Sequence, residues 1–133
     1  MKIAAHIENQ PGRHSVRVST NGSESSLSIP PKEPGAGSSV NGGELLFLAL
    51  ATCFCNDLYR EAGKRGIKVN RVTVSVEGEF GGEGEAARNI SYSARVDADA
   101  SEAEIRELVA HTDTVAEIQN TVRMGVQVTL KSD

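Results

Sequence analysis

Residues 41–64 read NGGELLFLALATCFCNDLYREAGK, and this stretch decides the fold. The run from Leu45 to Cys55 is apolar on every side, a pattern typical of a helix that is buried all round. Ser39 and Asn41 are both plausible caps for the beginning of such a helix, and Gly63 and Gly66 suit its end. We therefore predict a central helix over 41–64. Its apolar run is too short to span a bilayer.

The region before this helix has β character. Residues 14–20 alternate apolar and polar side chains, which predicts a half-buried strand. Asn21 and Gly22 favour a tight hairpin after it, because both central residues of that turn need a positive φ. We predict a β-hairpin region over 1–30. The Gly- and Pro-rich residues 31–40 form a loop that is long enough to be either mobile or functional.

The region after the helix continues with strands and short helices. Two alternating runs joined by a glycine-rich tip predict a β-hairpin over 67–97. Ser101 and Glu104 have the spacing of a capping box, which begins a pair of helices over 101–123. A last strand is predicted over 125–131.

The order of these elements indicates an α+β fold with mainly antiparallel pairing, in a single domain over 1–133. A chain of 133 residues has the size of one domain. Its few short strands would struggle to cover a helix that is apolar on all sides. We therefore predict a homodimer, in which a second copy of the chain completes the cover.

The composition excludes several classes of protein. With 38% apolar and 24% charged residues, the chain is an ordinary globular protein rather than a disordered one. The net charge of −4 gives no basic face, so neither nucleic acid nor a membrane is expected as a partner. The N-terminal residues lack the apolar segment of a secretion signal, and we predict a cytoplasmic protein.

Cys53 and Cys55 are the candidates for redox chemistry. Residues two apart on a helix point about 200° away from each other, so a disulfide between them would require unwinding. Free cysteines are often buried and inert. Both residues therefore stay open as core positions, Cys55 more readily than Cys53. The helix dipole does not reach Cys53 three turns in, and Asp57 at i+4 would oppose ionisation of its thiol.

A reactive Cys53 therefore needs a cation from elsewhere in the fold. Arg13 and Arg17 are the leading candidates, because a guanidinium remains charged and offers several donors. Arg17 fits equally well as an outward charge on an amphipathic strand. Arg13, beside a Pro-Gly turn at the entrance of a strand, is harder to explain as a solubility residue.

The remaining polar candidates are interpreted as structural. His6 and His14 lie on predicted strands without a carboxylate or cysteine at ligand spacing. His111 ends a helix, where an imidazolium is favourable to the last carbonyl groups. Two cysteines separated by one residue do not make a zinc site without a third ligand. We predict no metal and no cofactor.

The stretch Asn41–Leu46, followed by Ala51–Phe54, resembles the OsmC/Ohr family (osmotically inducible and organic hydroperoxide resistance proteins). Members of that family carry Asn-Pro-Glu-Glu-Leu followed at the same spacing by Ala-Cys-Phe. Further similarity lies in Gly12-Arg13, in Leu27–Pro30 and in Ala110-His111. The resemblance extends over essentially the whole chain.

This resemblance implies an intertwined homodimer, with a mainly antiparallel sheet wrapped around the long helix. It also implies reduction of peroxides by a cysteine pair, in which one thiolate becomes a sulfenic acid that a second thiol converts to a disulfide. Cys53 falls on the peroxide-attacking position and Arg13 on that of an arginine that stabilises the thiolate. The acidic partner of that arginine falls on Gly43, so Glu44, one residue later, is the candidate for its role.

The chain departs from the family where the second cysteine is expected, because Thr114 stands there. The sequence therefore leads to two hypotheses. The first is a thiol-dependent redox protein that reduces organic hydroperoxides through Cys53, with Arg13 and Glu44 as its partners and an external thiol as reductant. The alternative is a catalytically silent dimer of the same fold that binds a small apolar ligand or a partner.

Overall fold

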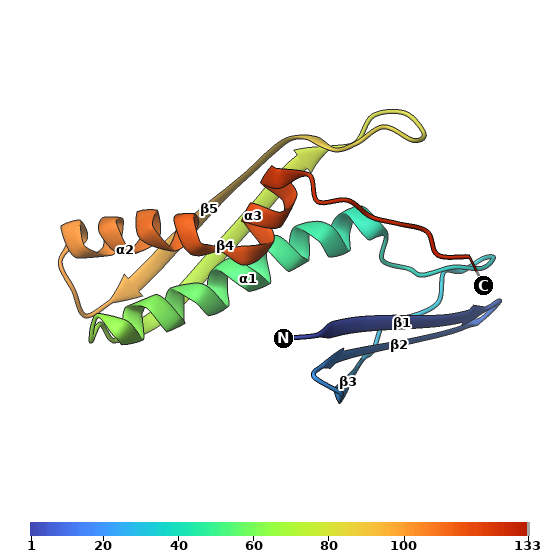
Figure 1. Ribbon diagram of the computed structural model, residues 1–133, viewed down its shortest axis with the longest axis horizontal. Helices are drawn as coiled ribbons and strands as arrows, with labels where there is room; N and C mark the ends of the chain where they lie inside the picture. The colour runs from blue at the N-terminus through green and yellow to red at the C-terminus, as the bar shows by residue number, and fades with distance from the viewer. Residues whose placement is uncertain (133) are drawn as a thin grey trace. The chain divides into compact units, whose positions relative to one another are not determined.

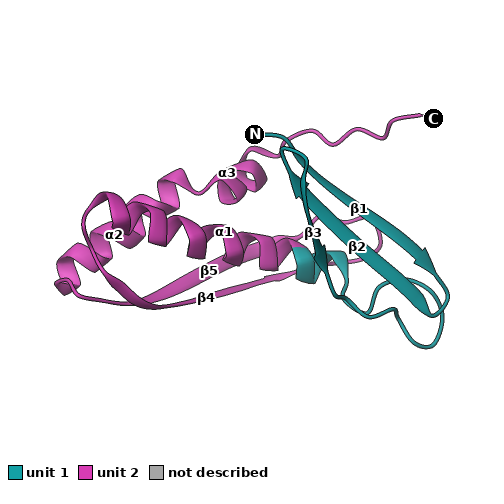
Figure 2. Cartoon of the chain, turned by 90° about the horizontal axis from the view of Figure 1, so that it is seen from below, with its two compact units in different colours: residues 1–45 teal, residues 46–133 magenta. Residues whose placement is uncertain are grey.

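The computed structural model describes residues 1–132. The chain forms two compact units, residues 1–45 and residues 46–133, which Figure 2 distinguishes by colour. The prediction of a single domain over 1–133 stays a prediction. The division arises because the first three strands pair only with one another, and the later two strands likewise form a sheet of their own.

The first unit contains a three-stranded antiparallel sheet in the order β1-β2-β3 (Figure 1). Its strands are β1 (Ile3–Gln10), β2 (Arg13–Thr20) and β3 (Ser23–Leu27). The turn between β2 and β3 places Asn21 at φ 50° and Gly22 at φ 83°, the two positive values that the predicted tight hairpin requires. The β-hairpin region therefore has the turn chemistry that the sequence indicates.

The loop of residues 31–40 is held against the first sheet by the side chain of Asn9. Asn9 Nδ2 donates to the carbonyl of Gly37 and the Gly37 N–H donates back to Asn9 Oδ1, both at 3.0 Å. Pro31 and Ser38 also form an isolated β-bridge across the loop. These bonds give the loop a fixed path along the strand that carries Asn9.

Helix α1 spans Gly42–Lys64, against a predicted range of 41–64. Asn41 and Glu44 cap its beginning reciprocally: the Glu44 N–H donates to Asn41 Oδ1 and the Asn41 N–H donates to Glu44 Oε2, both at 2.9 Å. This is the geometry of a capping box. The chain leaves the helix through Gly66 at φ 65°, a left-handed conformation that glycine adopts without steric cost.

The second unit adds a hairpin and two helices to α1. Strands β4 (Val69–Glu79) and β5 (Arg88–Ala98) pair antiparallel, and α2 (Glu102–Val115) and α3 (Glu117–Met124) follow. The predicted capping box of Ser101 begins α2. Figure 2 shows α1 and α2 together on one face of the β4–β5 hairpin.

The core of the second unit lies between these helices and the hairpin. Its buried residues come from α1, from α2 and from the link to α3: Phe54, Leu58, Ala62, Leu108 and Ala116. The inward side chains of the hairpin pack against these residues. One of them is Tyr92, whose ring contacts that of Phe54 edge to face, with 4.9 Å between the ring centroids. The alternation predicted for the hairpin therefore supplies one wall of this core.

The predicted strand over 125–131 is absent from the described part of the chain. Residues 126–132 have no regular secondary structure, although Val128 and Leu130 alternate with polar residues as a strand would and are almost fully exposed. A strand needs a neighbouring strand for its hydrogen bonds, and no strand within residues 1–132 pairs with this segment. The predicted single sheet also differs from the structure, because the strands of residues 1–132 form two separate sheets. No helix within residues 1–132 has the length and apolar character needed to cross a membrane.

Candidate active site

The candidate active site is a polar cluster around Cys53 inside the second unit, which we call the Cys53 cluster: Cys53, Asp57, Arg60 and Glu117. Cys53 is half-buried on α1. Its Sγ donates to Asp57 Oδ2 at 3.4 Å, one turn further along the same helix. Glu117, the first residue of α3, brings its Oε2 to 3.8 Å from the sulfur.

The positive charge of the cluster comes from Arg60. Its Nη1 lies 2.9 Å from Asp57 Oδ1 and 3.2 Å from Glu117 Oε1, and its Nε lies 2.9 Å from Glu61 Oε1. Each carboxylate of the cluster therefore has one oxygen on the guanidinium and the other toward the sulfur. Asp57 is almost completely buried, at 5% exposure, and such a carboxylate requires a partner of this kind.

The surroundings of Cys53 favour its neutral thiol. Burial raises the pKa of Cys53, the Ile118 N–H lowers it, and the hydrogen bond to Asp57 raises it again. The negative charges of Asp57 and Glu117 add to the rise. The opposing N–H is available because Ala116 cannot cap α3 with a side chain. Within this unit the thiol keeps its proton and offers it to a carboxylate.

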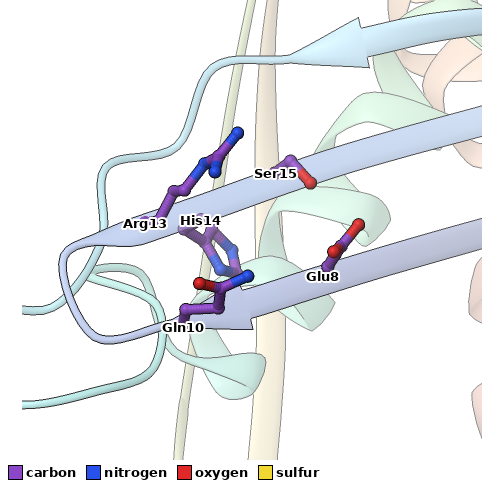
Figure 3. A pocket seen from close by; sticks show the side chains of 5 residues that line it. All are labelled: Glu8, Gln10, Arg13, His14 and Ser15. Carbon is purple, nitrogen blue, oxygen red and sulfur yellow. The ribbon is translucent and has the colours of Figure 1, made fainter.

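Arg13 lies in the other unit, at the beginning of β2. Figure 3 shows the small hollow that it lines together with Glu8, Gln10, His14 and Ser15, about 150 Å³ in volume. Arg13 has no ion-pair partner among the residues that the structure describes. The predicted contact between Arg13 and Cys53 stays a prediction, because the two residues belong to different units.

Arg17 and Glu44 already have structural partners. Arg17 pairs with Glu24 of the neighbouring strand at 3.9 Å, as an exposed charge on an amphipathic strand does. The carboxylate of Glu44 accepts the Asn41 N–H at the beginning of α1. Since α1 begins before Glu44 and continues through Cys53, nine residues of helix place the two on nearly opposite sides. The proposed acidic role of Glu44 stays a prediction.

Cys55 and the histidines lie outside the Cys53 cluster. Both cysteines are free, and α1 is continuous through them, so Cys55 faces another side of the helix and lines a shallow hollow with Val74 of β4. His14 Nδ1 lies 3.0 Å from Asn9 Nδ2, and His6 lies on exposed β1 opposite Arg17. His111 Nε2 lies 3.3 Å from Glu61 Oε2.

Sequence reasoning missed Arg60 and Glu117. Arg60 follows Cys53 by seven residues and Asp57 by three, which places all three on one face of a helix. That spacing was a usable signal. Glu117 is 64 residues away from Cys53 in the sequence, and only the packing of α3 against α1 brings them together.

The Cys53 cluster also has the donor atoms of a metal site. Cys53 Sγ and one carboxylate oxygen each from Asp57 and Glu117 lie within 4.8 Å of one another. Sulfur and carboxylate oxygens are ligands that zinc accepts. The guanidinium of Arg60 already supplies the positive charge that these carboxylates need, and we assign no metal to them.

Comparison with known proteins identifies the family. A family model described as OsmC-like protein matches residues 35–131. This match covers most of the chain, and the chain belongs to the OsmC-like protein family, as the sequence resemblance predicted. A comparison with curated proteins found no match.

Solved structures share the fold at low sequence identity. An OsmC-like protein from Mycoplasma pneumoniae is 20% identical, covering 90% of this chain and 87% of its own, with a TM-score of 0.63. An organic hydroperoxide resistance protein OsmC from Legionella pneumophila is 19% identical, covering 92% and 90%, with a TM-score of 0.60. An organic hydroperoxide resistance protein from Elizabethkingia anophelis, crystallised with thiocyanate, is 17% identical, covering 92% and 89%, with a TM-score of 0.56. The α+β fold with antiparallel sheets is therefore that of OsmC-like proteins.

Proposed function

We propose that this protein is a thiol-dependent redox protein that reduces organic hydroperoxides through Cys53. The observation that carries the proposal is the half-buried Cys53 thiol, which donates its hydrogen to Asp57 at 3.4 Å. Two of the solved structures that share its fold are named organic hydroperoxide resistance proteins, which supports this substrate class.

The reaction oxidises the Cys53 sulfur by two electrons. The sulfur forms a bond to the terminal peroxide oxygen, the O–O bond breaks, and the alkoxide that leaves takes up the thiol proton. The products are a cysteine sulfenic acid and an alcohol. One external thiol then condenses with the sulfenic acid to give a mixed disulfide and water. A second external thiol releases Cys53 as a thiol and leaves as a disulfide with the first.

An external reductant suits this chain because it offers no second thiol at the expected place. Thr114 stands there, and its Oγ1 donates to the carbonyl of His111 at 2.7 Å. Cys55, the other cysteine of the chain, faces a different side of the continuous helix α1. A cytoplasmic location would supply the thiols that such a reaction consumes.

The working protein in this proposal is a homodimer. Leu48 of α1, in the apolar run, is 56% exposed, and Val128 and Leu130 of the C-terminal segment are more than 90% exposed. Apolar side chains in this number are typical of a surface that another chain covers. In the dimer Arg13 would stabilise the thiolate and the developing sulfenate, with Glu44 as its acidic partner.

Stopped-flow kinetics with tert-butyl hydroperoxide tests the proposal. Wild type and Cys55→Ser should consume peroxide when either a monothiol or a dithiol is supplied, and Cys53→Ser should not. Arg13→Ala should react more slowly than wild type. Peroxide consumption by wild type that does not exceed the Cys53→Ser background would end the proposal.

Binding of a small apolar ligand is the second candidate function, and one observation favours it. A groove of about 390 Å³ lies in the second unit, between β5 and α2. Apolar and aromatic side chains dominate it: Phe54, Tyr92, Ala94, Val109 and Ala110, with Ser93 and Asp113 as polar members. Two results together would support this function: the protein leaves peroxide unchanged, and it binds an apolar fluorescent probe that the Val109→Trp variant no longer binds.

A further inference from the structure

We infer that Asp57 is a catalytic residue that accepts the proton of the Cys53 thiol when the sulfur attacks. Cys53 Sγ donates to Asp57 Oδ2 at 3.4 Å, so the acceptor already holds the hydrogen that must leave. Both residues lie on the continuous helix α1 at i and i+4, a separation at which side chains are neighbours. The peroxide step of this inference rests on the proposed function; the proton transfer itself does not.

The orientation of Asp57 is fixed by Arg60. Arg60 Nη1 lies 2.9 Å from Oδ1, which turns Oδ2 toward the sulfur. Asp57 is almost completely buried, and a buried carboxylate with one oxygen on a guanidinium has little freedom to rotate away. Arg60 thus acts as a positioning residue for the acceptor.

Glu117 is the weaker candidate for the same role. Its Oε2 lies further from the sulfur, at 3.8 Å, and its side chain is 64% exposed, so water competes for its oxygens. The groups that face the sulfur are therefore Asp57 and Arg60 from α1, and Glu117 with the Ile118 N–H from α3. Of these, only Asp57 combines the shorter distance with burial.

The inference gives each proton of the reaction a place. As the Cys53 sulfur bonds to an electrophile, its hydrogen passes to Asp57 Oδ2, and the carboxylate becomes a carboxylic acid. With a hydroperoxide, this acid protonates the alkoxide formed when the O–O bond breaks, and Asp57 returns to its ionised state. With an alkylating agent that loses a halide, the proton passes from Asp57 to water.

Replacing Asp57 by asparagine distinguishes a proton acceptor from a simple negative charge, because the two roles predict opposite changes in the reaction rate. If Asp57 acts only as a negative charge, Asp57→Asn lowers the thiol pKa and speeds the reaction. If Asp57 accepts the proton, Asp57→Asn slows the reaction at pH values where the thiol is neutral. Positioned proton acceptors contribute roughly 100-fold or more to a rate, so we expect a loss of at least about ten-fold.

The test measures alkylation of Cys53 by iodoacetamide between pH 5 and 9, with all variants in a Cys55→Ser background. The parent should keep a pH-independent rate over the range in which Asp57 is ionised and Cys53 is a neutral thiol, whereas Asp57→Asn should lose rate about ten-fold for each unit by which the pH falls across the same range. Glu117→Gln, the matched control, removes a charge but leaves the acceptor and should react faster than the parent. Alkylation of Asp57→Asn that equals or exceeds that of the parent at pH 6 would overturn the inference.

Two further measurements are needed. One distinguishes loss of the proton acceptor from loss of folding, and the other tests the peroxide reaction separately. Asp57→Ala should regain rate when formate is added, because a small carboxylate can enter the space and accept the proton, whereas damaged folding would not respond. Peroxide reduction is then measured on the same variants. If the parent does not reduce peroxide but its alkylation depends on Asp57, the proposed function alone is refuted. If the parent reduces peroxide but its alkylation does not depend on Asp57, this inference alone is refuted.

Discussion

The electrostatic role of Glu117 gives a prediction whose size follows from the structure. Glu117 Oε2 lies 3.8 Å from Cys53 Sγ, and the exposure of the Glu117 side chain makes the dielectric constant of water the appropriate one. Two unit charges at this distance repel by about 1 kcal/mol. Glu117→Gln removes that repulsion and lowers the pKa of the Cys53 thiol. At neutral pH, where the thiol dominates, alkylation should then be about six-fold faster.

The assay follows iodoacetamide alkylation by mass spectrometry in a Cys55→Ser background, so that a single thiol reacts. Glu107→Gln on α2 is the matched control. It removes a charge that pairs with Arg65 rather than with Cys53, and it should leave the rate unchanged. An unchanged or slower rate in Glu117→Gln would refute the reasoning, because Glu117 would then not act on the sulfur as a charge. At about 0.5 M salt the gain should shrink, since salt screens exposed charges.

Three further predictions concern stability. Hydrogen bonds from Lys64 and Arg60 lower the pKa of Glu61 from 4.5 to about 2, so its ionised form stabilises the fold above about pH 4.5, and this stability is lost as the pH falls toward 2. Urea titrations at a series of pH values should show this loss, and Glu61→Gln should flatten it. Ser101→Ala removes the cap of α2 and should lower the free energy of unfolding by about 1 kcal/mol, whereas a cap that is silent in the unfolding curve would contradict it. Leu108→Ala empties a fully buried core position and should cost roughly 2–5 kcal/mol; a smaller loss by thermal and urea unfolding would mean that the core closes around the gap.

The parts of the fold that the sequence predicted well are those that local chemistry determines. The cap that Asn41 gives to α1 and the positive φ values of Asn21 and Gly22 need only neighbouring residues. The same is true of the Ser101 capping box. These features are independent of what packs on top of them, so residue types at fixed spacing are sufficient to find them.

The parts that were predicted poorly depend on partners distant in the sequence. The segment 125–131 has the alternation of a strand, but an alternation alone does not supply a neighbouring strand, and the described chain offers none. The pairing of the strands in two separate sheets was not predictable either, because pairing is not visible in the period of a single strand.

The site shows the same limit. Cys53 and the opposing effect of Asp57 were predictable from helical spacing, and the structure joins them by a hydrogen bond. The sequence analysis assigned the cation to Arg13 and overlooked Arg60. Arg60 lies on the same face of α1 as Cys53 and binds Asp57 directly. Glu117 approaches the sulfur only because α3 folds back onto α1, and no pattern in the sequence announces that contact.

The clasp of Asn9 on Gly37 has a consequence for which mutations the protein tolerates. The Asn9 side chain binds the N–H and C=O groups of Gly37, so this contact involves the backbone of the loop and not its side chains. Most substitutions between positions 32 and 36 should therefore leave the clasp intact, whereas inserting or deleting a residue there would shift the peptide out of register with Asn9. Neither aspartate, which lacks the donor, nor glutamine, which is longer by one methylene, reproduces the two-pronged fit. Tolerance at this place in the chain is thus set mainly by length, with three exceptions: Asn9, and the glycines Gly35 and Gly37, whose positive φ values would strain any other residue.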